Sequence, residues 1–400
     1  MPRCRIVLTI GILTAALTAA APEVVSSATP TDDAAPAGAV RVIAADAATT
    51  AGAASALVTA MSTRERAASV VMGHIPTADP ARLAEYMAGS GIGGFILMGA
   101  NIPPTEAELR GVTQSLTADG ALPPLIAIDQ EGGDVSRLPW DEFPSALTLK
   151  DLPPDASRDA FAGRAALLTR AGIGVNFGIV ADVTADPASF IYRRALGTTP
   201  DAGAARVAAA ATGEAGSALS TLKHFPGHGA AAGDSHAGIP SSAMSEEVWS
   251  ASDALPFQSG IDAGAPILMF GHLSYSSVDA APASLSAEWH RIARDEMGFD
   301  GVTLTDDLGM LLASGVAEYS DPVANAVAAI AAGNDMVLAV AYSTGETASQ
   351  MVDGIAAAVD SGALPAQRLE EAAERVTRLR LDLAAQGRGL VPCADCSPAG

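Results

Sequence analysis

Short apolar runs alternate along the chain with longer amphipathic, alanine-rich segments. The runs are apolar on both faces and a helix-sized spacer follows most of them, which predicts parallel strands in βα units. This favours an α/β fold with a single (β/α)8, TIM-barrel-like domain. A doubly wound open sheet is the alternative, because periodicity cannot show whether a sheet closes. The eight predicted strands cover residues 68–73, 93–98, 125–129, 174–180, 220–224, 267–272, 302–306 and 336–340.

Polar residues mark the C-terminal ends of these predicted strands. In a barrel such ends converge on one face, where active sites are built. Strand ends also become polar simply because they meet water, which explains one or two polar residues but poorly explains five that are all Asp or His. We therefore expect one site that gathers Asp129, Asp182, His224, His272 and Asp306.

Residues 223–236, KHFPGHGAAAGDSH, hold three of the six histidines and one of the two lysines in the sequence. Their Gly-rich backbone allows close approach of a ligand. Asp234 stands two residues before His236, so it can orient the imidazole for general acid and base work, whereas a solvent-exposed loop histidine is the alternative. Lys223 and His224 end a predicted strand and are suited to binding ligand hydroxyls.

Two adjacent carboxylates, Asp306 and Asp307, follow the apolar run that begins at Val302. A carboxylate there projects into the barrel mouth and can act as a nucleophile or a general base. A helix is expected to begin near Leu308, and one of the two aspartates can cap it. We predict that Asp306 is the reacting group and that Asp307 supports it.

Composition and charge narrow the class of ligand. A net charge of −22 argues against nucleic acid and anionic membrane surfaces as partners and favours a neutral or cationic small ligand. No G-x-G-x-x-G motif indicates a dinucleotide, and we expect no cofactor. We expect no metal site either, because Pro226 and Gly227 prevent a helical pairing of His224 with His228. Zinc held by the loop histidines is the alternative.

The N-terminus is typical of an export signal, with Arg3 and Arg5 before an apolar run and an A-x-A cleavage site. An uncleaved membrane anchor is the alternative. We expect a secreted or cell-wall-associated monomer without membrane contact after cleavage. The expected divisions are a signal peptide (1–21), a flexible linker (22–55), the barrel (56–390) and a C-terminal tail (391–400).

Four segments together resemble the signatures of glycoside hydrolase family 3, in its NagZ-type β-N-acetylglucosaminidase (β-N-acetylhexosaminidase) branch. The resemblance covers roughly residues 64–380, which is essentially the whole predicted barrel. The segments are LIAIDQEGG (125–133), KHFPGHG with the following DSH (223–236), MGFDGVTLTDDLGM (297–310) and AAGNDMVL (331–338).

The resemblance implies a retaining glycosidase that releases terminal β-linked N-acetylglucosamine from muropeptides or chitooligosaccharides through a covalent glycosyl-enzyme intermediate. Asp306 matches the family's nucleophile, and His236 matches its general acid/base with Asp234 as partner. Most glycosidases use two carboxylates instead. The positions that match sugar-binding residues of the family are Asp129, Arg137, Arg194, Lys223 and His224.

Two positions depart from the family's pattern. Asp134 stands where a basic residue is usual, and the loop between His228 and Asp234 reads GAAAG where a polar pair is common. The first change can alter a local salt bridge, and the second can loosen the loop and lower the rate. The alternatives are therefore a β-glucosidase or other β-glycosidase of the same family, or a catalytically weak exported sugar-binding protein.

Overall fold

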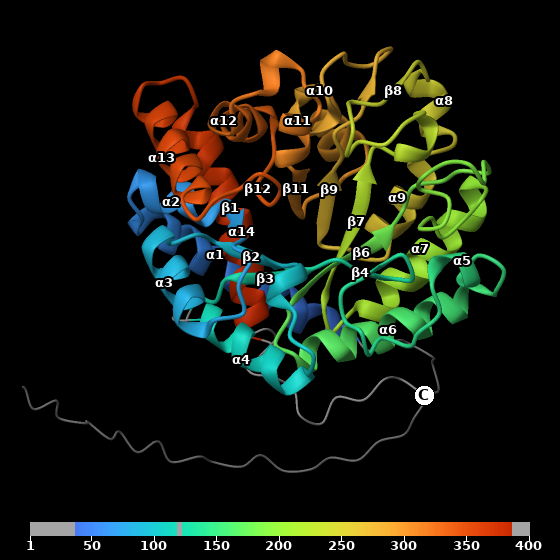
Figure 1. Ribbon diagram of the computed structural model, residues 1–400, viewed down its shortest axis with the longest axis horizontal. Coiled ribbons are helices and arrows are strands. Elements are labelled where there is room, and N and C mark those ends of the chain that lie inside the picture. Colours follow the sequence, from blue (N-terminus) through green and yellow to red (C-terminus); the bar gives the residue numbers. More distant parts are fainter. Residues whose placement is uncertain (1–36, 118–121, 386–400) are drawn as a thin grey trace, which may run out of the picture. The chain divides into compact units, whose positions relative to one another are not determined.

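The computed structural model describes residues 37–117 and 122–385, and within them eight parallel strands form a closed barrel in the order β1-β12-β11-β9-β7-β6-β3-β2 (Figure 1). The predicted fold class is therefore confirmed. The barrel strands are β1 (Val71–Gly73), β2 (Gly94–Leu97), β3 (Leu125–Ile128), β6 (Val175–Val180), β7 (Leu219–Phe225), β9 (Ile267–Phe270), β11 (Val302–Asp307) and β12 (Met336–Leu338).

The pairing of the first and last strands closes the barrel. Met72 of β1 lies beside Leu338 of β12 on one side and beside Gly94 of β2 on the other. An open sheet would leave β1 and β12 as unpaired edges, so the doubly wound alternative is wrong. Closure satisfies the backbone N–H and C=O groups that an edge strand exposes.

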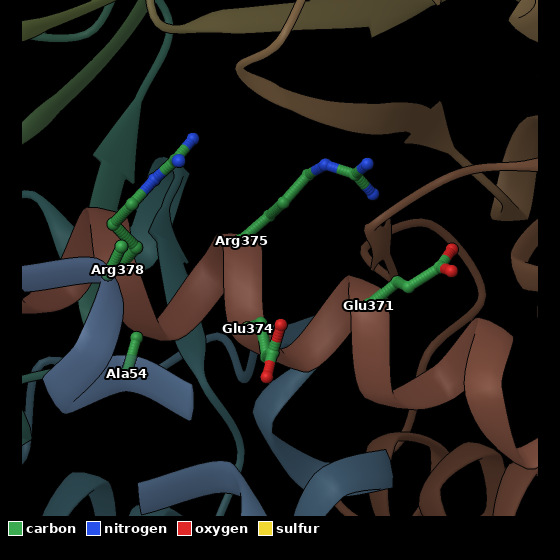
Figure 2. Close-up of a pocket in the computed structure, with 6 residues that line it drawn as sticks. Ala54, Glu371, Glu374, Arg375 and Arg378 are labelled. Atoms are coloured by element: carbon green, nitrogen blue, oxygen red, sulfur yellow. The ribbon is translucent and has the colours of Figure 1, made fainter. Parts of the chain in front are cut away.

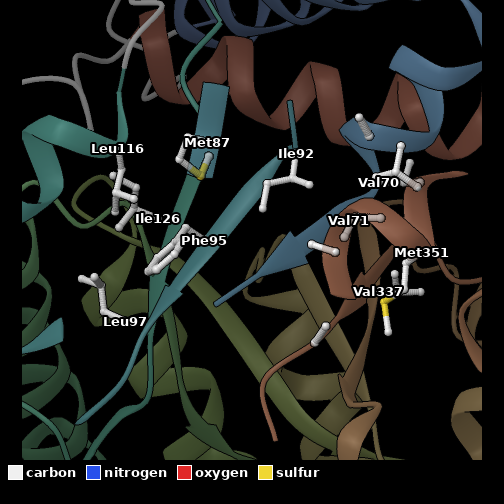
Figure 3. Packing of buried hydrophobic residues seen from close by; sticks show 14 of the residues in the cluster. Val70, Val71, Met87, Ile92, Phe95, Leu97, Leu116, Ile126, Val337 and Met351 are labelled. Carbon is white, nitrogen blue, oxygen red and sulfur yellow. The ribbon is translucent and has the colours of Figure 1, made fainter. Parts of the chain in front are cut away.

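Alternate residues of each strand face opposite sides of the barrel wall, as the two-residue period of a strand requires. Phe95 and Leu97 of β2 pack outward in the cluster shared with the helices (Figure 3), while Ile96 between them belongs to the cluster inside the barrel. All three side chains are fully or almost fully buried. Burial on both faces explains why the strands are continuous apolar runs in the sequence.

Polar caps fix where several outer helices begin. In α3, α7 and α12, an Asp or Thr side chain accepts a backbone N–H of the first turn, and a proline follows at the first helical position. This pairing satisfies helix-end donors and sets the first φ angle. The principal helices are α2 (Thr63–Ser69), α3 (Pro80–Ser90), α4 (Glu106–Leu116), α6 (Pro154–Arg170), α7 (Pro200–Glu214), α9 (Ala254–Asp262), α10 (Ala287–Arg291), α12 (Pro322–Ala332), α13 (Thr347–Asp360) and α14 (Ala366–Ala385).

The N-terminal boundary differs from the prediction. Helix α1 (Ala37–Ala60) covers the later part of the predicted linker, and Ala54 and Val58 of this helix are buried. The predicted start of the folded part at residue 56 is therefore too late. Alanine has the highest helix propensity, so an Ala-rich stretch that reads as a linker by composition can equally form a helix. The predicted signal peptide and C-terminal tail lie outside the described residues.

The strand starts, at the end of the barrel opposite the predicted site, are held by a buried carboxylate, Asp335. Three arginines, among them Arg375 at 3.1 Å, bind its two oxygens. Figure 2 shows Arg375 on helix α14, beside a cavity of about 210 Å³ where Glu371, Glu374 and Arg378 also lie. No residue of the predicted site lines this cavity, so we interpret this end as structural. Within the described residues, no helix is both long enough and apolar enough to span a bilayer.

Candidate active site

A cavity of about 270 Å³ opens at the C-terminal ends of the strands. We call it the mouth cavity. Seven of the eight site residues predicted from the sequence line it, and the eighth, Asp234, is hydrogen-bonded to one of them. Of the five residues that the strand-end argument named, Asp129, His224 and Asp306 line the cavity, whereas Asp182 and His272 do not. The seven are Asp129, Arg137, Arg194, Lys223, His224, His236 and Asp306.

Four charged side chains form one side of the mouth cavity, and we call them the charged floor: Glu131 and Lys223, which are buried, and Asp129 and Arg194, which are partly buried. The Lys223 Nζ lies 2.9 Å from Asp129 Oδ1 and 2.7 Å from Glu131 Oε1. Arg194 holds Glu131 with two bonds, of 2.8 and 2.9 Å. Each charge has an opposite partner, which is the condition for burying ions without a large penalty.

The floor carboxylates stay ionised. Burial would raise the pKa of Asp129, but Lys223 and Arg137 outweigh it and lower that pKa to about 2. Burial of Glu131 is likewise outweighed by Lys223 and Arg194, which hold the pKa of this carboxyl below its usual value. Arg137 lies at the rim of the cavity, and its Nη2 is 3.3 Å from Asp129 Oδ2. The arrangement offers fixed acceptors and donors, which suit the hydroxyls of a polar ligand.

Glu131 was not among the predicted site residues, although its side chain is only 2% exposed and binds both floor cations. It lies on a small hairpin, β4 (Gln130–Gly132) and β5 (Val135–Ser136), which follows Asp129 directly. The sequence signal was the neighbouring Gly132-Gly133 pair. Both glycines have positive φ, of 83° and 77°, and they form the tight turn between β4 and β5.

One side chain, Gln130, ties this hairpin together. Its Oε1 accepts the backbone N–H of Arg137 at 2.8 Å and of Leu138 at 3.0 Å. Its Nε2 donates to Ser136 Oγ and to Asp141 Oδ2, both at 2.6 Å. All four hydrogen-bonding positions of the amide are therefore used, which fixes the segment that carries Glu131 and Arg137.

His224 is oriented from below by a buried carboxylate. Its Nδ1 donates to Asp182 Oδ2 at 2.7 Å, which leaves Nε2 to accept from Arg194 Nη2 at 3.3 Å. Asp182 also accepts the backbone N–H groups of His224 and His228. Asp182 is thus a positioning group beneath the cavity, and the carboxylate–imidazole bond fixes which ring nitrogen faces the ligand.

The two aspartates at the end of β11 have different surroundings. Asp307 accepts three backbone N–H groups, from Gly309, Val340 and Ala341, at 2.8–2.9 Å. It therefore joins β11 to α11 (Gly309–Ala313) and to the segment after β12. The Asp306 carboxylate accepts the N–H of Asp307 at 2.8 Å and lines the mouth cavity. This geometry fits the predicted division between a reacting Asp306 and a supporting Asp307.

Asp306 lies among cationic and imidazole groups. Burial would raise its pKa, but His224, His272, the Asp307 N–H and Lys223 outweigh burial and hold that pKa below its ordinary value. His272 does not line the cavity. Its Nε2 donates to the Asp307 carbonyl at 2.8 Å and its Nδ1 accepts from Ser284 Oγ at 2.7 Å. Asp306 is therefore held as a carboxylate, the form that a nucleophile needs.

The predicted dyad lies at the rim of the mouth cavity. His236 Nδ1 donates to Asp234 Oδ1 at 2.6 Å, and the His236 backbone N–H reaches the same oxygen at 3.0 Å. The side chains are 63% and 45% exposed, unlike the floor. Burial would raise the pKa of Asp234, but the His236 backbone and ring bonds outweigh it and lower that pKa. Within the described part of the chain, only Nδ1 of the His236 ring has a hydrogen-bond partner, so Nε2 can serve for proton transfer.

The two departures noted in the sequence fall outside the floor. The Asp134 carboxylate accepts two hydrogen bonds from Arg193, at 2.6 and 3.0 Å, and both side chains are exposed. The Ala-rich segment before Asp234 lines a neighbouring cavity instead of the mouth cavity. Among the described residues, no three His, Cys, Asp or Glu side chains are grouped to hold a metal ion, so no cluster supports the loop-zinc alternative.

Comparison with known proteins identifies the family. The model of the glycosyl hydrolase family 3 N terminal domain matches residues 62–379. The chain belongs to this family. The resemblance inferred from its motifs is thereby confirmed, and this family 3 member is a glycosidase.

Named relatives extend this assignment. A beta-hexosaminidase of Methylococcus capsulatus is 34% identical over 288 residues, which cover 68% of this chain and 81% of that protein. Another, from Chromobacterium violaceum, is 36% identical over 273 residues, covering 65% and 74%. These matches span most of each relative.

Solved structures agree with the fold. A family 3 beta-N-acetylglucosaminidase from Paenibacillus superposes with a TM-score of 0.77 at 27% identity, covering 85% of this chain and 66% of that one. A beta-N-acetylhexosaminidase from Beutenbergia cavernae gives a TM-score of 0.70 at 29% identity, covering 82% of this chain and 99% of that one.

Proposed function

We propose that this family 3 glycosidase releases terminal β-linked N-acetylglucosamine from oligosaccharides by a retaining mechanism. The observation that carries the proposal is the meeting of Asp306 and the Asp234–His236 pair at one cavity, above a floor of fixed charges. The relatives named as hexosaminidases and acetylglucosaminidases support the choice of sugar. Muropeptides and chitooligosaccharides are the substrate classes that carry such a terminal residue.

In the first step, the Asp306 carboxylate attacks the anomeric carbon while the bond to the leaving oxygen breaks. His236 gives its proton to that oxygen, so the leaving group departs as an alcohol. In the second step, His236 takes a proton from water as the water attacks the anomeric carbon and displaces Asp306. Asp234 holds the His236 ring and stabilises its protonated form. Double displacement retains the anomeric configuration.

The direct test is release of 4-nitrophenol from its N-acetyl-β-glucosaminide. We expect turnover by the wild type and a loss of several powers of ten in Asp306→Ala, since that variant lacks the covalent route. Asp201→Asn, an exposed carboxylate on α7, is the matched control and should keep full activity. Full activity in Asp306→Ala would refute the assignment of the nucleophile.

Two further measurements bear on sugar and mechanism. A panel of aryl β-glycosides should show preference for the N-acetylglucosaminide over the glucoside. A 2-deoxy-2-fluoro or 5-fluoro glycosyl probe should label Asp306, which peptide mass analysis detects. Preference for the glucoside would contradict the proposed sugar specificity. Labelling of another residue would contradict the assignment of Asp306 as the nucleophile.

We also propose that the protein is exported and acts outside the cell or at the cell wall. The support is the basic-apolar pattern of residues 1–21, which lie outside the described residues. Cell fractionation with N-terminal sequencing tests this. A cytoplasmic protein that retains Met1 or Pro2 as its N-terminus would contradict export.

A further inference from the structure

The hairpin that carries Glu131 rests on buried polar side chains outside the barrel wall. Helices α6 and α7 cover strand β6, and β4 of the hairpin packs on the same strand (Figure 1). Val175 and Phe177 of β6 belong to the cluster inside the barrel, so Asn176 between them points outward, toward the helices. Asn176 is fully buried and does not line the mouth cavity.

The Asn176 amide pairs with both backbone groups of Gln130. Its Oδ1 accepts the Gln130 N–H at 3.1 Å, and its Nδ2 donates to the Gln130 carbonyl at 3.2 Å. Nδ2 also donates to Glu214 Oε1 at the end of α7. A Cβ at Gly178 would collide with Nδ2, so the backbone leaves this amide its place. The hairpin is thereby held from outside, one residue before Glu131.

The Glu214 carboxyl is an unusual group for this position. It is fully buried, and among the residues that the structure describes its Oε2 has no hydrogen-bond partner. Burial raises the pKa of Glu214 to about 8, and the Asn176 hydrogen bond and the Arg164 charge offset only part of this effect. Glu214 is therefore a neutral acid at pH 7 and loses its proton in mildly alkaline solution.

Arg164 of α6 offers the ionised Glu214 a second partner. The guanidinium is fully buried and binds Asp141 at 2.9 Å, but its Nη1 has no hydrogen-bond partner within residues 37–117 and 122–385. A Cβ at Gly132 would collide with this guanidinium, so Arg164 packs directly beneath the hairpin turn. A negative charge on Glu214 is attracted toward Arg164, and the resulting shift of the carboxylate disturbs its bond to Asn176.

Other charges around α7 are turned away from Glu214 or already paired. Strand β6 carries no charged residue, and the others on the packed elements are exposed, bound to other carboxylates, or part of the mouth cavity. They include Arg158 and Arg170 of α6, Asp262 of α9, and Lys223 and His224 of β7. Within the described part of the chain, Arg164 is thus the charge that acts on Glu214.

We propose that Glu214 is a positioning residue for substrate binding: from outside the barrel wall it holds Asn176 against the backbone of the Glu131 hairpin. This inference rests on the proposed function, in which the charged floor binds the terminal sugar. Glu131 passes the effect to the floor, because it binds Lys223 at 2.7 Å and Arg194 at 2.8 Å. Loss of the Glu214 proton loosens the hairpin and weakens binding, while the reacting groups keep their places.

The test begins with two substitutions at one position. Glu214→Leu removes the acceptor of the Asn176 amide, and we expect KM to rise by about 3- to 10-fold with kcat changed less than about twofold. Glu214→Gln keeps an acceptor there and should return KM at pH 7 to within about twofold of the wild type. The substrate is whichever aryl β-glycoside the wild type cleaves fastest, so failure of the proposed sugar leaves this test intact.

The pH profile distinguishes positioning from a purely structural role. Between about pH 7 and 9.5, KM of the wild type should rise by up to about tenfold as Glu214 loses its proton. KM of Glu214→Gln, which cannot ionise at this position, should rise much less over the same range. Superimposable KM profiles of the two proteins would overturn the proposal, and this comparison stands even if Glu214→Leu does not fold.

The matched control is Thr113→Val. Thr113 of α4 is also buried, and its hydroxyl donates to the Ala171 carbonyl at 2.7 Å, where neither residue lines the mouth cavity. This variant should be less stable in thermal unfolding and keep the wild-type KM. A rise in KM in the control would show that KM follows general loosening of the fold. A less stable Glu214→Leu with the wild-type KM would show that Glu214 only supports the fold. Either result overturns the proposal.

Discussion

The charged floor and the dyad loop meet at the same cavity but are built in opposite ways. The floor charges are buried or mostly buried, and each has an opposite partner within 3 Å. The dyad is largely exposed, and among the residues that the structure describes the His236 ring is held by the Asp234 carboxylate alone. The floor is thus organised before substrate arrives, which suits binding, whereas the dyad can move, which suits a group that serves as acid in one step and base in the next.

The largest expected effect comes from breaking the floor. Glu131→Gln leaves Lys223 and Arg194 buried with one carboxylate fewer, which should cost about 3–5 kcal/mol in the free energy of unfolding. Denaturant titration measures it. The control is Asp134→Asn, on the same hairpin but with an exposed partner, which should leave stability unchanged because exposed ion pairs contribute little. Equal stability of the two variants would contradict the distinction between floor and rim.

The dyad should show the reverse behaviour. Asp234→Ala removes the group that orients His236, so kcat/KM on a disaccharide should fall by about 100-fold while thermal stability stays unchanged. Ser241→Ala, an exposed position after the dyad loop, is the control. A loss of stability that matches the loss of rate would show that Asp234 is structural.

The same difference decides what the sequence could predict. Floor residues such as Asp129 and Lys223 could be predicted because each is a polar residue at the end of an apolar run. In a barrel, the C-terminal ends of all strands lie on the same face. The sequence could distinguish Asp307 from Asp306 only by its expected role as a helix cap. The hydrogen bonds that Asp307 accepts from Val340 and Ala341 could not be predicted, because those residues are distant in the sequence. Glu131 was missed because its pairing with Arg194, 63 residues away, has no local signature.

The pH dependence of activity and that of folding should differ, because the first depends on groups outside the charged floor and the second on the floor itself. The carboxyl of Asp129 has its pKa lowered to about 2 from 3.8, so the stability it contributes is present above pH 3.8 and lost as pH falls through 2. Lowered pKa values also keep Glu131 and Asp306 ionised. We therefore expect the floor carboxylates to stay ionised down to about pH 4. A roughly tenfold change in kcat/KM between pH 5 and 8 then arises outside the floor, at the dyad loop or at Asp307, whose pKa burial raises to about 6.

Rate and circular dichroism profiles over the same buffers check this expectation. Asp234→Ala should move or flatten the rate profile without moving the unfolding profile. If rate and folding are lost together at one pH, the floor and not the dyad governs the dependence.

The smallest expected effect tests how the floor is held. Ser136→Ala removes one of the four bonds made by the Gln130 amide, the 2.6 Å bond from Nε2. The loss should be about 1 kcal/mol in stability, with a few-fold rise in KM and little change in kcat, because the hairpin then holds Arg137 less firmly beside Asp129. Ser115→Ala removes a similar bond on α4, away from the cavity, and should leave KM unchanged. A rise in KM for both variants, or for neither, would show that the hydrogen bonds of Gln130 do not affect how the floor binds substrate.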